Sequence, residues 1–312
     1  MRSQSHVYYG LVVALLINVS GCTSVQRSAS NAAISAQEVE LVNVPFYPQT
    51  DRQCGPAALA TVLKHAGVTR TLQQLEDEVF IPQRQGSLAI EMLSATRRAG
   101  VVPYVLKPET QALFQEVAAG NPVVVLQNLR FDFLPLWHFA VVVGFDTAAQ
   151  TVTLRSGDEA RHLMSIADFD NSWAKAQRWA FVALPAERLP ATANAADFVN
   201  AVITLERVSP KQAARAYQTA VNAWPENLLA RLALGNSNYR RHDLVAAQDQ
   251  YTQATLDNPD SADAWNNLAQ VLYDTHQLSQ AREAIAKAVA IGGPRLSTYE
   301  STQIKMQSSQ MQ

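Results

Sequence analysis

The sequence predicts an α+β domain followed by an all-α domain built from repeats. The chain has 312 residues, which is enough for about two domains. Between residues 39 and 186, helix-like stretches come first and strand-like stretches follow, as is typical of an α+β fold. From residue 197 onward the pattern is helical and repeats every 34 residues. The hydrophobic fraction of 48% allows ordinary buried cores and excludes a disordered chain.

The N-terminal segment has the pattern of a secretory signal. Arg2 precedes an apolar run from Val7 to Val19, which is too short for a membrane span. The run ends at Ser20-Gly21-Cys22, and small residues before a cysteine resemble the lipobox of bacterial lipoproteins. This resemblance implies cleavage before Cys22 and lipid on its thiol and new amino terminus. An ordinary signal peptide with an incidental cysteine is the alternative.

The residues around Cys22 also bear on location and partners. Thr23 stands where an Asp would signal inner-membrane retention, so resemblance to Gram-negative sorting favours the outer membrane, facing the periplasm. Residues 22–38 lack apolar periodicity and predict a lipidated flexible tether, with the lipid as the membrane contact. A formal net charge of −2 gives no basic surface for phosphates, so no nucleic-acid partner is expected.

The C-terminal region contains the 34-residue repeat. Ala213, Ala247 and Ala281 share this spacing, and so do Tyr217, Tyr251 and Ile285. Small residues let two helices of a hairpin approach closely, and larger residues fill the remaining space. The pattern resembles the tetratricopeptide repeat, with three repeats at about 194–227, 228–261 and 262–295. A helical bundle without repeats is the alternative. Repeats of this kind bind protein or peptide segments on a concave face.

Cys54 is the candidate nucleophile of the first domain. Once lipid occupies Cys22, Cys54 is the only free thiol, because the chain has 2 cysteines. Pro56 suits the first turn of a helix, so Cys54 lies at a helix N-terminus. The partial positive charge there lowers a thiol pKa and favours thiolate. A small buried hydrophobic residue is the alternative interpretation of Cys54.

His138 is the candidate base. It begins an apolar strand that continues to Asp146, and a histidine at the mouth of a buried strand can face a helix N-terminus across a cleft. Its imidazole would take the thiol proton and give a thiolate–imidazolium pair. The alternative is a histidine satisfied by the backbone. The preceding stretch, Phe131–Trp137, either lines a substrate cleft or packs in the core.

Together these two motifs resemble a known family. Gln-x4-Cys-Gly-Pro-Ala-Ala-Leu at residues 49–59, with Trp-His-Phe-Ala-Val-Val-Val-Gly-Phe-Asp at 137–146, is similar to the bacteriocin-processing, papain-like cysteine peptidases that cleave double-glycine leaders. The resemblance covers about residues 40–186 and implies an α+β papain-like fold. It assigns Cys54 as nucleophile and His138 as general base. Gln49 matches the glutamine that donates to the oxyanion. No cofactor or metal is implied.

The third member of the site departs from the family pattern. The family has an Asp or Asn beyond the histidine strand, and position 156 is a serine here. Asp158 lies two residues further on and is the first choice to orient the imidazole, although a solvated turn charge is its simpler interpretation. Ser156 is the alternative, and Asp146 or a backbone carbonyl remains open.

The function expected from these features is that of a lipid-anchored cysteine peptidase acting on a peptide or protein. Its repeats would recruit the substrate or a protein partner. A catalytically weak peptidase-like scaffold and a thiol amidase or acyl transferase on the same core are the alternatives. The expected domains are a signal peptide at 1–21, the tether at 22–38, the peptidase domain at 39–186, a linker at 187–196, repeats at 197–295 and a polar tail at 296–312.

Within the first domain, the apolar patterns predict individual elements. Helices are expected after Gly55, after the capping-box spacing of Thr71 to Gln74, and over Gly86–Arg98. Strands are expected at Val101–Leu106, Pro122–Gln127, Phe139–Phe145, Val152–Arg155 and Trp179–Leu184.

Overall fold

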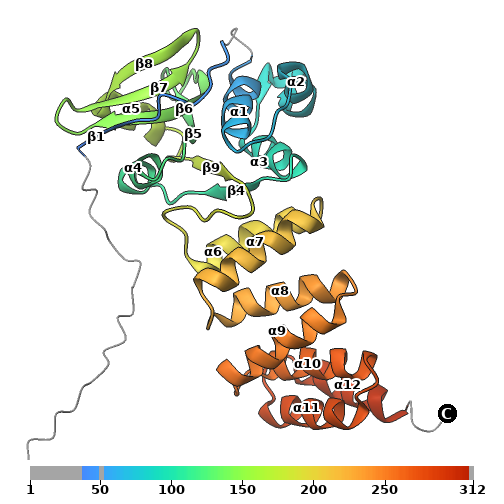
Figure 1. Ribbon diagram of the computed structural model, residues 1–312. Coiled ribbons are helices and arrows are strands. Elements are labelled where there is room, and N and C mark those ends of the chain that lie inside the picture. Colours follow the sequence, from blue (N-terminus) through green and yellow to red (C-terminus); the bar gives the residue numbers. More distant parts are fainter. Residues whose placement is uncertain (1–36, 49–52, 309–312) are drawn as a thin grey trace, which may run out of the picture. The chain divides into compact units, whose positions relative to one another are not determined.

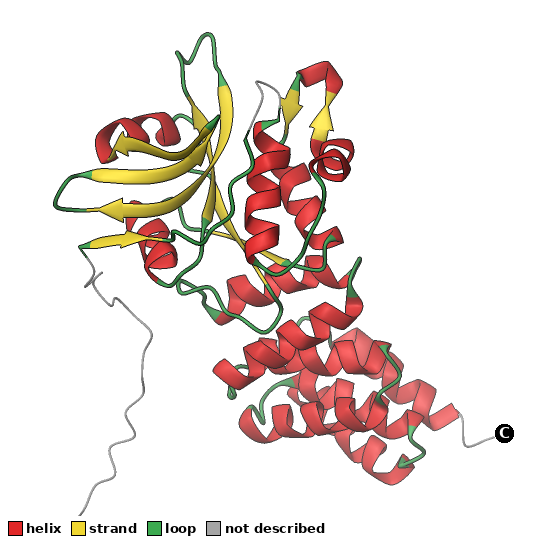
Figure 2. Ribbon diagram, turned by 45° about the horizontal axis from the view of Figure 1, so that its top comes forward, coloured by secondary structure: helices red, strands yellow, loops and turns green. Residues whose placement is uncertain are grey.

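The computed structural model describes residues 37–48 and 53–308 (Figure 1). Residues Ala36–Gln312 form one compact unit. All of its named strands lie in the first part of the chain, and the part that follows is helical (Figure 2). The predicted fold, an α+β domain followed by antiparallel helices in repeats, is confirmed.

The first domain combines five α-helices with nine strands among the described residues. The helices are α1 (Cys54–His65), α2 (Leu72–Val79), α3 (Ala89–Arg98), α4 (Thr110–Ala118) and α5 (Ile166–Ala174), with a short 3-10 turn at Pro82–Arg84. The strands are β1 (Glu38–Glu40), β2 (Phe80–Ile81), β3 (Gly86–Ser87), β4 (Val102–Val105), β5 (Val123–Asn128), β6 (Trp137–Asp146), β7 (Thr151–Ser156), β8 (Glu159–Ser165) and β9 (Ala180–Leu184).

A seven-stranded antiparallel sheet organises this domain. Its order is β4-β9-β5-β6-β7-β8, and β1 pairs with β6 at Glu38 to Asp146. Strand β6 is central because β1, β5 and β7 all pair with it. The separate hairpin of β2 and β3 lies outside this sheet. The strands predicted from apolar runs correspond to β4, β5, β6, β7 and β9 of this sheet.

Helix α1 forms the core against this sheet. Nine of its residues are buried, from Gly55 to Leu63. It packs on β6, where Phe139, Val141 and Val143 belong to the same apolar cluster as Leu59 and Val62. At the start of α2, the expected capping box is present: Thr71 Oγ1 accepts from the Gln74 amide, and the Gln74 side chain accepts from the Thr71 amide. Because α1 is buried along its length, its first residue, Cys54, is held firmly against β6.

A buried carboxylate fixes the segment that follows the sheet. Glu116 on α4 has no exposed surface. Its oxygens accept hydrogen bonds from Asn121 Nδ2, from the amides of Ala191 and Thr192, and from Thr192 Oγ1, at 2.7–3.1 Å. A buried charge needs this many donors to offset its lost hydration. The stretch expected as a linker is therefore anchored to α4 at residues 191 and 192.

The second domain consists of three helix pairs and a further helix. The pairs are α6 (Ala195–Glu206) with α7 (Pro210–Ala223), α8 (Leu228–Arg240) with α9 (Leu244–Asp257), and α10 (Ala262–Asp274) with α11 (Leu278–Ile291). The first helix of each pair begins after a side-chain cap: Asn194, Asn227 and Ser261 each accept from the amide three residues on. His242 and His276 occupy the same exposed left-handed turn of successive repeats.

The C-terminal stretch differs from the expected polar tail. Residues Leu296–Ser308 form helix α12. Tyr299 and Met306 are buried, seven residues apart on one face, and belong to the apolar cluster of the last repeat. Tyr299 also donates to Asp263 Oδ1 at 2.6 Å. These few apolar contacts stabilise a helix whose remaining surface is polar. Because most of its residues are polar, the sequence did not predict this helix.

Gly235 and Tyr251 provide a test of the repeat packing. A Cβ added to Gly235 would lie 2.5 Å from Tyr251 Cε1, and the buried ring is held by its hydroxyl on Asn236. The next repeat places Ala269 and Ile285 at the same positions. We predict that Gly235→Ala lowers the free energy of unfolding of the repeats by about 1–3 kcal/mol. Denaturant unfolding followed by circular dichroism measures this change.

The compensating pair is the control. Replacing Gly235→Ala together with Tyr251→Ile reproduces the pair of the following repeat, and the double variant should lose less stability than the two single losses added together. The higher helix propensity of Ala, worth about 1 kcal/mol over Gly, opposes the loss of stability that the collision with Tyr251 causes. A Gly235→Ala variant that is more stable than the wild type would contradict the packing argument.

Candidate active site

Cys54 is the first residue of α1 and lies against the start of β6. Pro56 occupies the first turn, where its missing amide hydrogen leaves no intrahelical bond unmade. The thiol packs beside the apolar cluster that includes Phe139 and is itself partly buried. The backbone amide of Phe139 points at the sulfur, as do the amides of Gly55 and of Cys54 itself. Since Phe139 follows His138, the nucleophile lies one residue along the strand from the predicted base.

Burial changes the expected ionisation of Cys54. The loss of hydration raises the pKa of the thiol above its ordinary value, and the three amides oppose this effect without overcoming it. The prediction from the helix N-terminus was a lowered thiol pKa. In the folded protein the desolvation of the sulfur outweighs the partial charge of the helix, so the resting thiol is protonated at neutral pH.

Gly55 allows β3 to approach the nucleophile. A Cβ at this position would lie 2.3 Å from Ser87 Oγ and 2.6 Å from Ser87 Cβ. Any larger residue would push β3 away from α1 and open the wall beside Cys54. The Ser87 hydroxyl is buried and has no hydrogen-bond partner among the described residues. The sequence alone did not reveal this steric requirement at Gly55.

His138 is the second residue of β6 and is held by the neighbouring strand. Its Nε2 lies 2.8 Å from Ser156 Oγ, at the end of β7. Burial lowers the pKa of His138 to about 4, and repulsion from the nearby His162 adds to the shift. The ring is therefore neutral at pH 7, with Ser156 on one nitrogen and the other nitrogen left to act as a base.

The directions of the two pKa shifts do not favour the expected thiolate–imidazolium pair in the absence of substrate. Between Cys54 and His138 there is no direct hydrogen bond in the described part of the chain, and both groups favour their neutral forms. Catalytic hydrogen bonds are often long without substrate and tighten when it binds. The structure thus brings His138 to Ser156 and brings the Cys54 sulfur to the Phe139 amide.

The other predicted site residues lie in different places. Gln49 lies outside the described residues. Gln53, the glutamine next to Cys54 in the sequence, was not a predicted site residue, and its side chain donates to Glu76 Oε2 at 3.2 Å. Asp158 is exposed in the turn between β7 and β8, and Asp146 ends β6 at the far end from His138. Asp146 Oδ1 accepts from the amides of Ala148 and Ala149, so it serves the following turn.

A cavity of about 740 Å³ gives access to Cys54. Pro135, Leu136 and Trp137 line one part of it, so the aromatic stretch before His138 does contribute to a cleft. The remaining lining comes from Cys54, the β2–β3 turn and β3 at residues 84–89, Leu126, Phe139, and residues 175–177. An extended peptide can therefore reach the sulfur.

Several residues of the site were not found from the sequence. Arg155 is 7% exposed and donates to the carbonyls of Val44 and Ala160, and so joins β7 to the segment that leads toward Gln49. His162 on β8 lies close enough to His138 to lower its pKa, and the His162 Nδ1 lies 3.2 Å from Glu159 Oε1. The sequence does not reveal the contacts of Arg155 and His162, because these depend on strand pairing that sequence spacing does not give.

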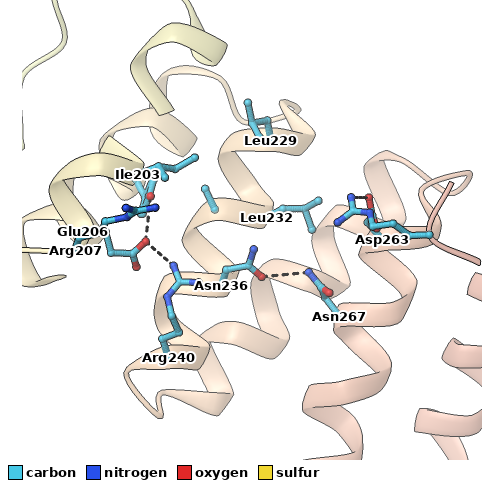
Figure 3. Close-up of a pocket in the computed structure, with 12 residues that line it drawn as sticks. Ile203, Glu206, Arg207, Leu229, Leu232, Asn236, Arg240, Asp263 and Asn267 are labelled. Atoms are coloured by element: carbon cyan, nitrogen blue, oxygen red, sulfur yellow. Dashed lines mark hydrogen bonds and ion pairs between the residues drawn. The ribbon is translucent and has the colours of Figure 1, made fainter. Parts of the chain in front are cut away.

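The repeats contain a second cavity, of about 580 Å³ (Figure 3). Asn236 on α8 accepts a hydrogen bond from Asn267 on α10 at 3.2 Å, and Ile203, Leu229 and Leu232 supply apolar lining. Arg240 pairs with Glu206, and Arg295 pairs with Asp263. The cavity thus offers amide and apolar groups, with most of its charges already paired.

The predicted lipid site at Cys22 and the signal segment lie outside the described residues. Among the residues that are described, no helix is both long enough and apolar enough to span a bilayer.

The chain resembles known proteins in two separate regions. Residues 41–181 match the peptidase C39-like family, and residues 232–295 match the tetratricopeptide repeat. None of the curated proteins matches the sequence. A C39-like peptidase structure from Bacillus anthracis aligns at 20% identity over 48% of this chain and 98% of its own, with a TM-score of 0.41.

Two further solved structures are similar to the separate regions. The peptidase domain of Streptococcus ComA, a bifunctional ABC transporter, aligns at 23% identity over 46% of this chain and 98% of its own, with a TM-score of 0.38. The first TPR domain of Spaghetti (RPAP3), bound to an HSP90 peptide, aligns at 13% identity over 38% and 94%, with a TM-score of 0.35. The chain thus has a peptidase C39-like domain, matched at residues 41–181, followed by a tetratricopeptide-repeat region, matched at residues 232–295.

Proposed function

We propose that the protein is a lipid-anchored cysteine peptidase that hydrolyses a peptide bond through Cys54 and His138. The observation that carries this proposal is the position of Cys54: it begins a buried helix, lines a cavity large enough for a peptide, and lies beside the strand residue that follows His138. The C39-like family assignment supports a cysteine peptidase for the same residues.

The neutral resting state sets the order of proton transfer. As the Cys54 sulfur attacks the substrate carbonyl, its proton moves to the free nitrogen of His138, and the carbonyl oxygen gains the negative charge. The Cys54 amide and the proposed donor Gln49 hold this oxyanion. The C–N bond then breaks as His138 returns the proton to the leaving amine, and a thioester remains on Cys54. Water, deprotonated by His138, cleaves the thioester and regenerates the thiol.

In this proposal, Ser156 does the work of the Asp or Asn that the family has beyond the histidine strand. Its hydroxyl accepts from Nε2–H of His138, fixes the tautomer, and leaves the other nitrogen to accept the thiol proton. A hydroxyl carries no charge, so it orients the ring without raising its pKa. Asp158, which the sequence favours for this role, lies exposed in the next turn.

The repeats and the anchor complete the proposal. The cavity between α6, α8 and α10 would hold an extended segment of a protein partner or substrate, because Asn236 and Asn267 offer amide groups to a peptide backbone. A lipid on Cys22 would hold the chain at the bacterial outer membrane, facing the periplasm. Incorporation of a labelled fatty acid, lost in Cys22→Ser, tests the anchor.

Cleavage by Cys54 can be tested without knowing the natural substrate. The purified protein is incubated with a peptide mixture from a digest of cell-envelope proteins, and new termini are identified by mass spectrometry. New termini should appear with the wild type and be absent with Cys54→Ala, because no other described group can form the thioester. His138→Gln should lower the rate roughly 10²- to 10⁴-fold through loss of the base.

The matched controls decide between the alternatives. Asp146→Asn changes a residue at the far end of β6 and should leave the rate unchanged. Cleavage that persists in Cys54→Ala would disprove the mechanism, and a wild type without any cleavage would support a peptidase-like scaffold. Products that contain an added amine would instead identify an acyl transferase.

The role of Ser156 is tested on one peptide that the wild type cleaves in the experiment above. Ser156→Ala should lower kcat about 3- to 10-fold, the usual net worth of one hydrogen bond. Because His138 must be neutral to act, kcat/KM should rise as the pH passes about 4. Ser156→Asp places a negative charge beside the ring, favours the imidazolium, and should shift this rise to higher pH.

Asp158→Asn is the matched control for Ser156. It removes a carboxylate two residues away, and neither kcat nor the acid limb should change. A large loss in Asp158→Asn with no effect of Ser156→Ala would return the orienting role to Asp158 and contradict the assignment to the hydroxyl.

A further inference from the structure

The loop between β5 and β6, residues 129–136, presents a strongly apolar tip to solvent. Phe131, Phe133 and Leu134 are 65%, 85% and 57% exposed. Adjacent large apolar side chains with this exposure are uncommon on a soluble protein and mark a surface that binds something apolar. We refer to these three residues as the apolar tip.

The apolar tip is preformed. At the base of the loop, Asn128 is buried, and its Oδ1 accepts hydrogen bonds from the amides of Arg130 and Leu136 at 3.1 and 3.0 Å. The Leu134 amide donates to the Phe131 carbonyl, and the rings of Phe131 and Phe133 stack with centroids 5.3 Å apart. A loop that is already ordered loses little conformational entropy on binding. Its exposure is therefore a stable feature of the fold.

A peptide bound at Cys54 would leave the apolar tip uncovered. The base of the loop, at Pro135, Leu136 and Trp137, lines the cavity that contains the thiol. The three tip residues are not among the described residues that line this cavity. The tip and the cleft therefore meet different partners, although both belong to one loop.

The charges around the apolar tip are mostly positive. Arg130 is in the loop, and Lys175 Nζ donates to the Arg130 carbonyl at 2.8 Å. Arg84 and Lys175 line the cavity at the base of the loop, and Asp132 is the single acid of the loop. Exposed aromatic side chains with Arg130 and Lys175 beside them suit the interface of an anionic bilayer, where rings lie at the headgroup level and cations meet lipid phosphates.

We propose that the apolar tip inserts into the interfacial layer of an anionic bilayer and holds the mouth of the cleft at the membrane surface. This inference builds on the proposed anchor at Cys22. The chain from Cys22 to the start of β1 can span no more than about 55 Å, so an anchored domain works close to the lipid. Substrates would then be peptide segments presented at the membrane surface.

The test uses the chain from residue 23, which lacks the lipid site but retains the whole compact unit from Ala36 onward. Circular dichroism checks that each variant is folded. Binding is measured by flotation with vesicles of phosphatidylethanolamine and phosphatidylglycerol, and with phosphatidylcholine vesicles for comparison. The wild type should bind the anionic vesicles, and binding should weaken with salt and on neutral vesicles. Phe133→Asp should weaken binding at least tenfold, while Phe133→Trp should retain it.

Leu256→Asp is the matched control, because Leu256 on α9 is 68% exposed and receives the same new charge. It should bind vesicles like the wild type. Equal binding by Phe133→Asp and Leu256→Asp would overturn the proposal, as would an absence of binding by the wild type.

Hydrolysis of a short soluble peptide tells whether the apolar tip binds the membrane or the substrate. Phe133→Asp should leave its kcat/KM unchanged, because the apolar tip does not line the cleft. A tenfold loss of kcat/KM in Phe133→Asp would show that the apolar tip binds substrate and would overturn the proposal. Fatty-acid labelling of Cys22 is measured separately. If Cys22 is not labelled but the vesicles are still bound, only the proposed lipid anchor is disproved. If Cys22 is labelled but the vesicles are not bound, only the proposed role of the apolar tip is disproved.

Discussion

The site depends on the close packing of the N-terminus of α1 against the start of β6 and against β3. Gly55 permits this approach, since any Cβ would collide with the side chain of Ser87. The approach places the Cys54 sulfur at the Phe139 amide and leaves it facing a cavity. The apolar residues of α1 bury the helix against the sheet, so the packing of the core also fixes the position of the candidate nucleophile Cys54.

The same burial governs the electrostatics of the site. Removing water from Cys54 and His138 disfavours a charge on either, so the thiol stays protonated and the imidazole stays neutral until a substrate arrives. Ser156 contacts His138 Nε2 without adding a charge. The departure from the family pattern at position 156 is thus compatible with the neutral base that the proposed mechanism requires.

The sequence was sufficient to predict the elements that bury long apolar runs, and the positions of Cys54 and His138 at the ends of two of them. It was insufficient for β8, whose residues are largely exposed and lack alternation, and therefore for His162, which β8 brings to His138. The helix α12 was hidden by its polar composition, since Tyr299 and Met306 alone bury it. The thiol pKa was predicted in the wrong direction because desolvation depends on packing around Cys54, whereas the helix N-terminus is visible in the sequence.

The most direct test of the account is a crystal structure of the protein with a peptide aldehyde, built on a peptide that the enzyme cleaves. The account predicts a thiohemiacetal on Cys54, with the free nitrogen of the His138 ring within hydrogen-bond distance of its sulfur or oxygen and Ser156 still on Nε2. The peptide should occupy the cavity between residues 84–89 and 135–137. An aldehyde that leaves Cys54 unmodified, or a His138 ring that remains beyond reach of the adduct, would contradict the proposed chemistry.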